Sequence, residues 1–393
     1  MTPTIQASGI RTVVARNPSE IDEIRDEWEA LTARHAQFAC AQNDAVRLMV
    51  ETRILADRLA PRVVLFKDEN GPRGIVVGKL FDQKIRCRIG YLKLPLMTLK
   101  CFAVAYGGIV TDGTSEAQDA VFNYLTQIRQ DRQVDYVMIN HLPASHELFS
   151  RIKNSGPDMQ TADVHWRWWL GKTSEESLSH RSGKTRRTIR RDDKRLCAQF
   201  KTELRLRRWE HEGEVDDFCT VASQIAAKGY QGAMQIGFVD TPLWREFLKE
   251  EARFGRLRSY TLEGDGQAIA FQVGVLRRGV CIMEGTAFLP ELRAFSPGQV
   301  MQIRIVEDLC QDRARAIDWG FGDAHYKQVF GTERIEETTF YFYGRRAKAQ
   351  IAKRVVGFCD RLTDTIGRAV RRVGFYDWIK RKWRRYMESR AEA

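Results

Sequence analysis

The sequence predicts an α/β fold with mixed sheets, arranged as two tandem domains and followed by a basic helical tail. Hydrophobic patterns typical of helices and of strands alternate along the 393 residues. Both halves also run through the same order of elements: helices, an antiparallel meander, then a helix, a strand, a helix and a strand. This repeated order indicates a duplicated fold. We expect domains at 1–170 and 171–345, with the tail at 346–393.

The first half contains four predicted helices and five predicted strands. Ile21, Ile24, Trp28 and Leu31 share one helical face, and the turn residues 68–72 separate the first two strands. The predicted helices are 18–36, 44–59, 115–130 and 145–153, and the predicted strands are 63–66, 75–80, 85–91, 134–140 and 164–170.

The second half opens with a strand and two helices and continues with a meander. Tight turns at 264–266 and 277–279 separate the three strands of that meander. The predicted strands are 203–209, 257–263, 268–276, 280–288, 316–319 and 337–343, and the predicted helices are 215–227, 242–254, 297–316 and 324–330.

Composition excludes several classes of protein. Hydrophobic residues make up 43% and charged residues 29% of the chain, as in ordinary folded proteins. No apolar run approaches the length of a membrane-spanning helix, and the N-terminus lacks a long apolar core. The eight cysteines are scattered, which favours buried thiols in a reducing compartment over a disulfide framework or a metal site. We therefore expect a cytoplasmic protein without a metal.

Positive charge is concentrated in the tail. The net charge is +12, and residues 345–393 contain 15 Lys/Arg against five Asp/Glu. Leu362, Ile366, Val370 and Val373 recur at helical spacing within this segment. A basic amphipathic helix of this kind can lie on an anionic membrane, which would hold the protein at the inner face. The alternative is that its apolar side packs on the main body.

A second basic run lies at 181–195, with eight basic and two acidic residues. Only Ile189 and, just after the run, Leu196 are apolar, which predicts a helix with one narrow buried seam and a wide cationic surface. Such a surface can receive phosphates or another polyanion. The alternative is a solvated helix that Asp192 and Asp193 partly neutralise.

The junction at 296–298 predicts an anion-binding helix start. Ser296 suits an N-cap, Pro297 suits the first helical turn, and Gly298 keeps the backbone bare. The N–H groups of Ser296, Pro297, Gly298, Gln299, Val300 and Met301 would then surround one point, apart from the proline, which has none. A diphosphate fits a helix start of this kind, and an ordinary capped helix is the alternative.

Four motifs in the second half resemble the GNAT acyltransferase superfamily. They are KTRRTIRRDDKRL at 184–196, AIAF at 268–271, FSPG at 295–298 and DWGFGDAHYKQVF at 318–330. More narrowly, residues 180–343 look like the CelD-like acetyltransferase-domain family, which is related to the Fem-type transferases with tandem GNAT folds.

The resemblance implies transfer of an acyl group from a thioester, usually acetyl-CoA, to an amine or a hydroxyl. The diphosphate of the coenzyme would lie on the amides of 296–301. Its pantetheine arm would lie beside strand 280–288, where that strand and strand 316–319 separate. Since the turn FSPGQV has one glycine where typical members of the superfamily have two, acyl-carrier protein and aminoacyl-tRNA are alternative donors, and helix 181–195 would suit either.

Four residues are candidates for the chemistry. Glu284 or Asp318 could take the proton of the attacking group. The resemblance gives Tyr326 the role of protonating the departing thiolate, and Lys327 could hold an anionic acceptor or orient Asp318. A backbone N–H near 285–287 would stabilise the oxyanion. The alternatives are a surface strand residue for Glu284 and a turn cap for Asp318.

We interpret the first half as a degenerate domain that supplies a wall of the acceptor cleft. The leading hypothesis is an N- or O-acyltransferase acting on a small acceptor, such as a sugar precursor for polysaccharide or cell-envelope synthesis. The alternatives are a Fem-type transferase that uses aminoacyl-tRNA and a non-catalytic scaffold bound to the membrane through its tail.

Overall fold

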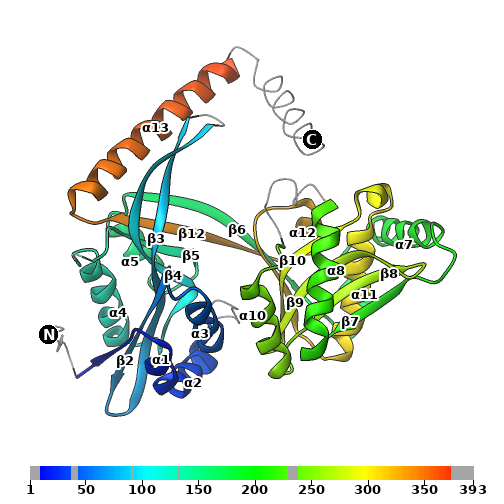
Figure 1. Cartoon of the computed structure of the whole chain (residues 1–393), viewed down its shortest axis with the longest axis horizontal. Helices are drawn as coiled ribbons and strands as arrows, with labels where there is room; N and C mark the ends of the chain where they lie inside the picture. The colour runs from blue at the N-terminus through cyan, green and yellow to red at the C-terminus, as the bar shows by residue number, and fades with distance from the viewer. Residues whose placement is uncertain (1–8, 37–42, 90–91, 132, 229–237, 373–393) are drawn as a thin grey trace. The chain divides into compact units, whose positions relative to one another are not determined.

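The computed structural model describes residues 9–36, 43–89, 92–131, 133–228 and 238–372. The described residues divide into two compact units (Figure 1). Those between 9 and 162 and between 337 and 372 form unit 1, and those between 163 and 336 form unit 2. Strands β6 (Met159–Trp169) and β12 (Glu333–Tyr343) each contribute residues to both units.

Unit 1 is a mixed sheet with helices on both faces. The strands follow the order β1-β2-β3-β4-β5-β12, in which β4 and β5 are parallel and the other pairs with a recorded register are antiparallel. Its elements in chain order are β1 (Arg11–Ala15), α1 (Pro18–Glu23), α2 (Arg25–His35), α3 (Ala45–Ile54), β2 (Leu59–Asp68), β3 (Gly71–Ile89), β4 (Leu92–Thr111), α4 (Ser115–Ile128), β5 (Tyr136–Pro143), α5 (Phe149–Asn154) and α13 (Ala347–Arg372).

Alternation along the strands of unit 1 builds two separate cores. Val63 and Leu65 of β2 pack with Trp28 under α1, α2 and α3. Val64 and Phe66 point to the other face and pack under α4 and α5. Because successive side chains of a strand point to opposite faces, the part of β2 that is buried on both sides, residues 63–66, is apolar throughout.

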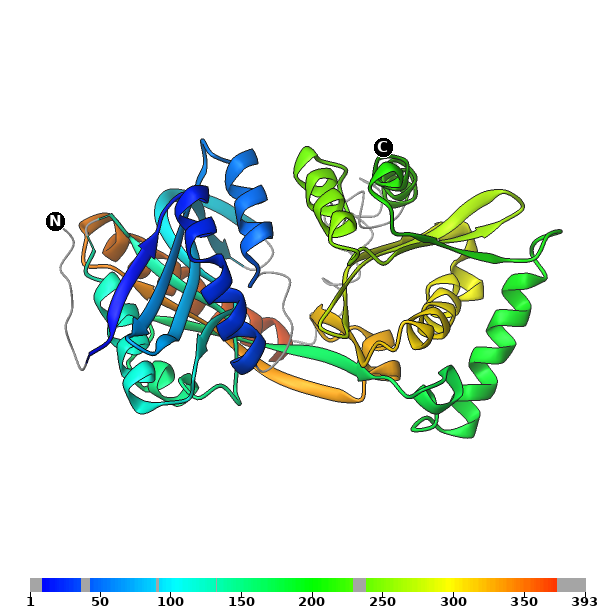
Figure 2. The ribbon, with the colours of Figure 1, turned by 90° about the horizontal axis from the view of Figure 1, so that it is seen from below.

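Unit 2 has the strand order β6-β11-β10-β9-β8-β7, in which β10 and β11 are parallel. Its main core is a cluster that includes Phe218, Phe271 and Trp168, and a small second cluster joins Val280 and Ala316. Figure 2 shows α8 and α10, in green, on one side of this sheet and α11, in yellow, on the other. The elements are α6 (Ser174–Ser177), α7 (Gly183–Cys197), β7 (Arg205–Trp209), η1 (Glu212–Glu214), α8 (Val215–Lys228), α10 (Pro242–Arg253), β8 (Ser259–Gly264), β9 (Gln267–Arg277), β10 (Val280–Phe288), η2 (Pro290–Phe295), α11 (Pro297–Gln311), β11 (Ala316–Phe321) and α12 (His325–Phe330).

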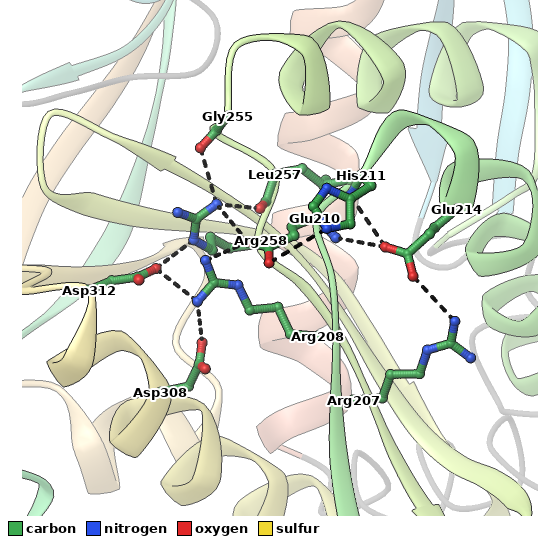
Figure 3. A network of polar contacts seen from close by, with 10 residues as sticks. All are labelled: Arg207, Arg208, Glu210, His211, Glu214, Gly255, Leu257, Arg258, Asp308 and Asp312. Atoms are coloured by element: carbon green, nitrogen blue, oxygen red, sulfur yellow. Dashed lines mark hydrogen bonds and ion pairs between the residues drawn. The ribbon is translucent and has the colours of Figure 1, made fainter.

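A polar network fixes the C-terminal end of α11 to the edge of the sheet (Figure 3). Arg208 of β7 pairs with Asp308 at 3.3 Å and with Asp312 at 3.1 Å. Arg258, just before β8, pairs with Asp312 at 2.6 Å, and the hydroxyl of Tyr260 donates to Asp308 at 2.7 Å. Since these groups are only partly exposed, the network holds one end of α11 and thereby sets where its other end lies.

The mixed α/β fold class predicted from the sequence is confirmed. The compact units, however, divide the chain inside β6 and β12, whereas we expected boundaries at 170 and 345. The difference arises because β12 returns to pair with β5, with Tyr343 opposite Tyr136. Sequence analysis also missed β1 and β4.

The first part of the basic tail forms α13, which lies in unit 1. Its Ala349, Ala352 and Cys359 are buried, and the first two belong to a cluster with Leu99 and Tyr136. This part of the tail therefore packs on the body of unit 1 through Ala349, Ala352 and Cys359, and membrane binding by the tail stays a prediction. Val373 lies outside the described residues. Within the described residues, no helix combines the length and the apolar composition that crossing a bilayer requires.

Candidate active site

Strands β10 and β11 separate after a short parallel pairing. They pair at three positions, from Val280 opposite Ala316 to Ile282 opposite Asp318. Against β9, the register of β10 shifts between Met283 and Gly285, so that Glu284 is the extra residue of a bulge. Beyond Ile282, β11 no longer pairs with β10. The backbone of the last residues of β10 is therefore available on that side to an extended ligand.

Helix α11 begins close to this edge. A Cβ atom added at Gly298 would lie 3.5 Å from the ring of Phe288, the last residue of β10. Ser296 occupies the N-cap position with φ 55° and ψ 46°, and its side chain makes no capping hydrogen bond. The left-handed backbone, rather than the predicted side-chain cap, therefore turns the chain into the helix.

The helix start offers fewer amides than the sequence suggested. The N–H groups of Gln299 and Val300 donate to the carbonyl of Ser296 at 3.0 and 3.2 Å, and Ser296 itself donates to Arg293. Val300 and Met301 are buried, whereas Gly298 is partly exposed. Among these described residues, Gly298 is thus the position whose N–H is best placed to meet an anion, with the dipole of α11 behind it.

The cationic side chain of Arg195 lies beside the start of α11. The guanidinium of Arg195, on α7, lies 5.5 Å from the centre of the Phe295 ring, directly before Ser296. The side chain of Arg195 is half exposed, and its ion pair with Asp192 is long, at 3.9 Å. The basic helix predicted at 181–195 therefore contacts the segment that leads into α11.

A chain of buried amides connects α11 to the bulge. Gln302 donates to Gln272 at 3.0 Å, and Gln272 donates to the carbonyl of Gly285 at 2.9 Å. At the other end, the indole of Trp319 donates to Gln302 at 3.4 Å. Both glutamines are almost fully buried. Since buried amides need partners, this chain couples the positions of β11, α11, β9 and β10.

Asp318 lies beneath the point of separation rather than in an open groove. It is 2% exposed, and its carboxylate lies 2.6 Å from His165 Nε2, 3.7 Å from the Arg167 guanidinium and 2.9 Å from the Gly320 amide. Burial alone would raise the pKa of Asp318, but His165, Arg167 and the amide together hold it below its usual value. The carboxylate is thus ionised at neutral pH and is a weak proton acceptor.

Lys327 and Tyr326 follow on α12. The ammonium of Lys327 donates to the carbonyls of Gly320, at 3.3 Å, and Phe321. Burial lowers the pKa of Lys327 to about 8, although nearby carboxylates oppose the shift. Burial raises the pKa of Tyr326 to about 12, and its ring packs edge-on against Trp319 at 6.0 Å. Tyr326 therefore remains protonated at neutral pH and can act only as a proton donor.

The structure gathers three of the four candidate catalytic residues around one strand end. Asp318 and Lys327 both bond to Gly320 near the end of β11, and Tyr326 packs against Trp319 of the same strand. Glu284 lies on the bulge of β10 and is partly exposed. Sequence analysis missed His165 and Gln302. The alternation of His165 and Arg167 with Trp166 and Trp168 was a signal that polar side chains of β6 share one face. In the described part of the chain, no three His, Cys, Asp or Glu side chains gather as metal ligands would.

Comparisons with known proteins agree with this geometry. Residues 183–328 match the family model described as "Acetyltransferase (GNAT) domain". This segment contains β10, α11, β11 and the start of α12, which are the elements that form the candidate site. A search of curated proteins gave no match.

Solved structures share the fold across both units. FemX has 12% identity and a TM-score of 0.59, with 84% of this chain and 98% of that chain covered. A protein of unknown function from Bacteroides thetaiotaomicron has 11% identity and a TM-score of 0.53, with 84% and 100% covered. The C-terminal domain of a putative lysylphosphatidylglycerol synthetase from Agrobacterium fabrum has 13% identity and a TM-score of 0.50, with 83% and 94% covered.

The matched domain defines a transferase of the GNAT type. Residues 183–328 form a GNAT-type acetyltransferase domain, as the family model that matches them indicates. Its narrower membership in the CelD-like family stays a prediction, as do the roles of the individual site residues.

Proposed function

We propose that unit 2 binds an acyl-CoA and transfers its acyl group to the amine or hydroxyl of a small acceptor. The observation that carries the proposal is the separation of β10 and β11 after three paired residues, with the start of α11 beside the end of β10. An extended thioester arm can pair with the free edge of β10, and a diphosphate can meet the Gly298 amide and the helix dipole. Members of the GNAT superfamily use acyl-CoA in general, which supports this donor.

Glu284 fits the role of general base better than Asp318 does. It lies on the bulge where the strands diverge and is partly exposed, whereas Asp318 is buried and held ionised by three partners. In this scheme Glu284 takes the proton of the acceptor as its nitrogen or oxygen attacks the thioester carbon. Asp318 instead orients His165 and the turn at Gly320.

Tyr326 completes the transfer in this scheme. As the tetrahedral intermediate collapses, the carbon–sulfur bond breaks, and the hydroxyl of Tyr326 gives its proton to the leaving thiolate. Backbone N–H groups at 285–287 stabilise the oxyanion, since they lie on the strand edge beside the thioester. Lys327, whose pKa is lowered, lies beside Gly320 and Phe321 and can hold an anionic group of the acceptor.

A thermal-shift titration with acetyl-CoA tests the proposal. We expect acetyl-CoA to raise the melting temperature, since a ligand that binds only the folded state stabilises it by about 2.7 kcal/mol at 100 times its Kd. Gly298→Trp should abolish the shift, because the indole would lie against Phe288 and cover the helix start. Gly213→Trp is the control, since a Cβ atom added there meets nothing within 4 Å. If neither acetyl-CoA nor longer acyl-CoAs shift the wild type, the proposal fails.

The cationic surface of α7 supports a second candidate, transfer from aminoacyl-tRNA. Lys184, Arg190 and Lys194 of α7 are exposed. A polyanion bound there would lose affinity steeply with salt. The Arg186→Glu, Arg187→Glu, Arg190→Glu and Arg191→Glu variant should then lose tRNA binding. Retention of tRNA binding by this variant would exclude α7 as the tRNA surface and would remove the observation that supports this candidate.

A further inference from the structure

Unit 1 repeats the strand separation of unit 2. Strands β4 and β5 pair in parallel at four positions, from Cys101 opposite Tyr136 to Val104 opposite Ile139. Directly beyond, the register of β4 against β3 jumps, so that residues 105–108 form an irregular loop-out. A cavity of about 170 Å³ opens at this point. It lies where the strands part and α4 begins, which is the position of the candidate site in unit 2.

One part of the cavity wall is apolar, whereas Thr111, Asn140, His146 and Glu147 make another part polar. Val104, Ile109 and Ile139 line it, together with Gly107 and Gly108. Gly108 cannot carry a side chain, since an added Cβ atom would lie 2.7 Å from the carbonyl of Val77. An apolar cavity of about 150 Å³ holds benzene, so this one has room for a ligand of about six to seven non-hydrogen atoms.

A carboxylate lies near the start of α4, whereas the cation Arg195 lies near the start of α11. Glu147 lies there, and its carboxylate accepts hydrogen bonds from Thr111 Oγ1 and, at 3.2 Å, from Gln118 of α4. Glu147 is exposed, and no cation contacts its carboxylate among the described residues. It occupies the region where an anion would otherwise meet the helix dipole.

The other titratable groups on the cavity wall do not offset this negative charge. Asp112 is compensated by Arg73 at 3.0 Å. His146 is held by two bonds, Nε2 to the Ile109 carbonyl at 3.2 Å and Nδ1 from the Leu148 amide at 3.1 Å. This pairing requires the neutral ring with its proton on Nε2, and burial lowers the pKa of His146 accordingly. His35, at the end of α2, is exposed to solvent.

We propose that this cavity binds a small aliphatic primary amine, with its alkyl chain between β4 and β5 and its ammonium group at Glu147. The apolar part of the wall can pack against the alkyl chain, and Glu147 repels the diphosphate of a coenzyme. Asn140 adds a polar group to the wall, since its Nδ2 donates to Val104 at 2.9 Å and its Oδ1 remains an acceptor. The site belongs to unit 1 alone and does not depend on the function proposed for unit 2.

A matched series of ligands tests the site in the full chain. The probes are n-pentylamine, 1-pentanol and pentanoate, which share an alkyl chain and differ in the charge of the head group. We expect n-pentylamine to bind with a millimolar Kd, at least tenfold tighter than the other two. Methyl NMR signals of Val104, Ile109 and Ile139 should shift on binding, which places the ligand in the cavity. Equal affinities for the three probes, or no shift of these methyls, would overturn the proposal.

Two variants identify the charge that matters. Glu147→Gln should weaken n-pentylamine binding at least tenfold, and since Glu147 is exposed the fold should persist. Glu116→Gln is the control, because Glu116 is an exposed carboxylate in the first turn of the same helix. The affinity of the Glu116→Gln variant for n-pentylamine should match that of the wild type. If Glu147→Gln binds the amine as the wild type does, or if acetyl-CoA shifts the same three methyls, the cavity is not an amine site.

Discussion

The substitution Asp318→Asn probes the buried charge cluster beneath the strand separation. The change removes a charge that lies 2.6 Å from His165 and 3.7 Å from Arg167, and leaves the Arg167 guanidinium in the interior. Removing one member of a buried ion pair costs about 3–5 kcal/mol. We expect about 3 kcal/mol, the lower end of that range, because Asn can still accept from the Gly320 amide and Arg167 keeps Glu333 at 3.0 Å.

Urea unfolding followed by tryptophan fluorescence measures this loss, since Trp168 and Trp319 lie in the core of unit 2. The matched control is Glu336→Gln. Glu336 pairs with Arg334 at 2.7 Å, but its side chain is 69% exposed, so the loss should stay under about 1 kcal/mol. A loss for Asp318→Asn as small as that of the control would refute the inference that a buried charge cluster holds this strand end.

The pH dependence has a definite sign. The folded-state pKa of Asp318 is lowered, so its contribution to stability is present above its unfolded-state pKa and is lost as the pH falls through the folded value. The difference in unfolding free energy between wild type and Asp318→Asn should therefore be largest near neutrality and should shrink below about pH 4. A difference that is constant down to pH 3 would mean that folding does not lower the pKa of this carboxylate.

Three further predictions concern other parts of the molecule. Gln302→Leu should cost about 2 kcal/mol in thermal unfolding, because Gln272 loses its buried donor; an unchanged melting temperature would contradict the amide chain. Burial lowers the pKa of Lys327 to about 8, so between pH 8 and pH 10 the unfolded state holds this proton more than the folded state does. The unfolding free energy of the wild type relative to Lys327→Met should therefore rise over this range, and a fall would refute the lowered pKa. Ile351 and Phe358 of α13 are 51% and 65% exposed. Changing both to Ser should weaken sedimentation with anionic vesicles about tenfold and leave the melting temperature unchanged. Equal sedimentation of the variant and the wild type would exclude these residues from membrane binding.

Hydrophobic periodicity was enough to predict most of unit 2. The three strands of its meander and the start of α11 at Pro297 lie where the pattern put them, because tight turns and a proline mark their ends. Periodicity failed for β4, a strand of 20 residues in which it predicted neither a strand nor a helix. Pro95 and the glycines at 107 and 108 interrupt its pattern, and the structure uses those glycines for an irregular register against β3.

The candidate site was predictable only in part. Spacing and motifs pointed to Glu284, Asp318 and the turn at Gly298, because each lies in or beside a strand or helix that the pattern reveals. The partners of Asp318 could not be found in this way, since His165 and Arg167 are distant in sequence and reach Asp318 only through the antiparallel pairing of β6 with β11. The cavity of unit 1 was also missed, since it depends on a strand that the pattern did not reveal.

The interruption of unit 1 by residues 163–336 affects the order in which the protein can form during synthesis. Strand β5 has β12 as its neighbour on one side, yet β12 follows the whole of unit 2 in the chain. On the ribosome, the nascent N-terminal segment must therefore wait, with that edge of β5 unpaired, until Tyr343 has emerged. The described residues of unit 2 all lie between 163 and 336 and have no such delay, so this unit can mature first. A chaperone that shields an open strand edge would then act on the earlier-made segment.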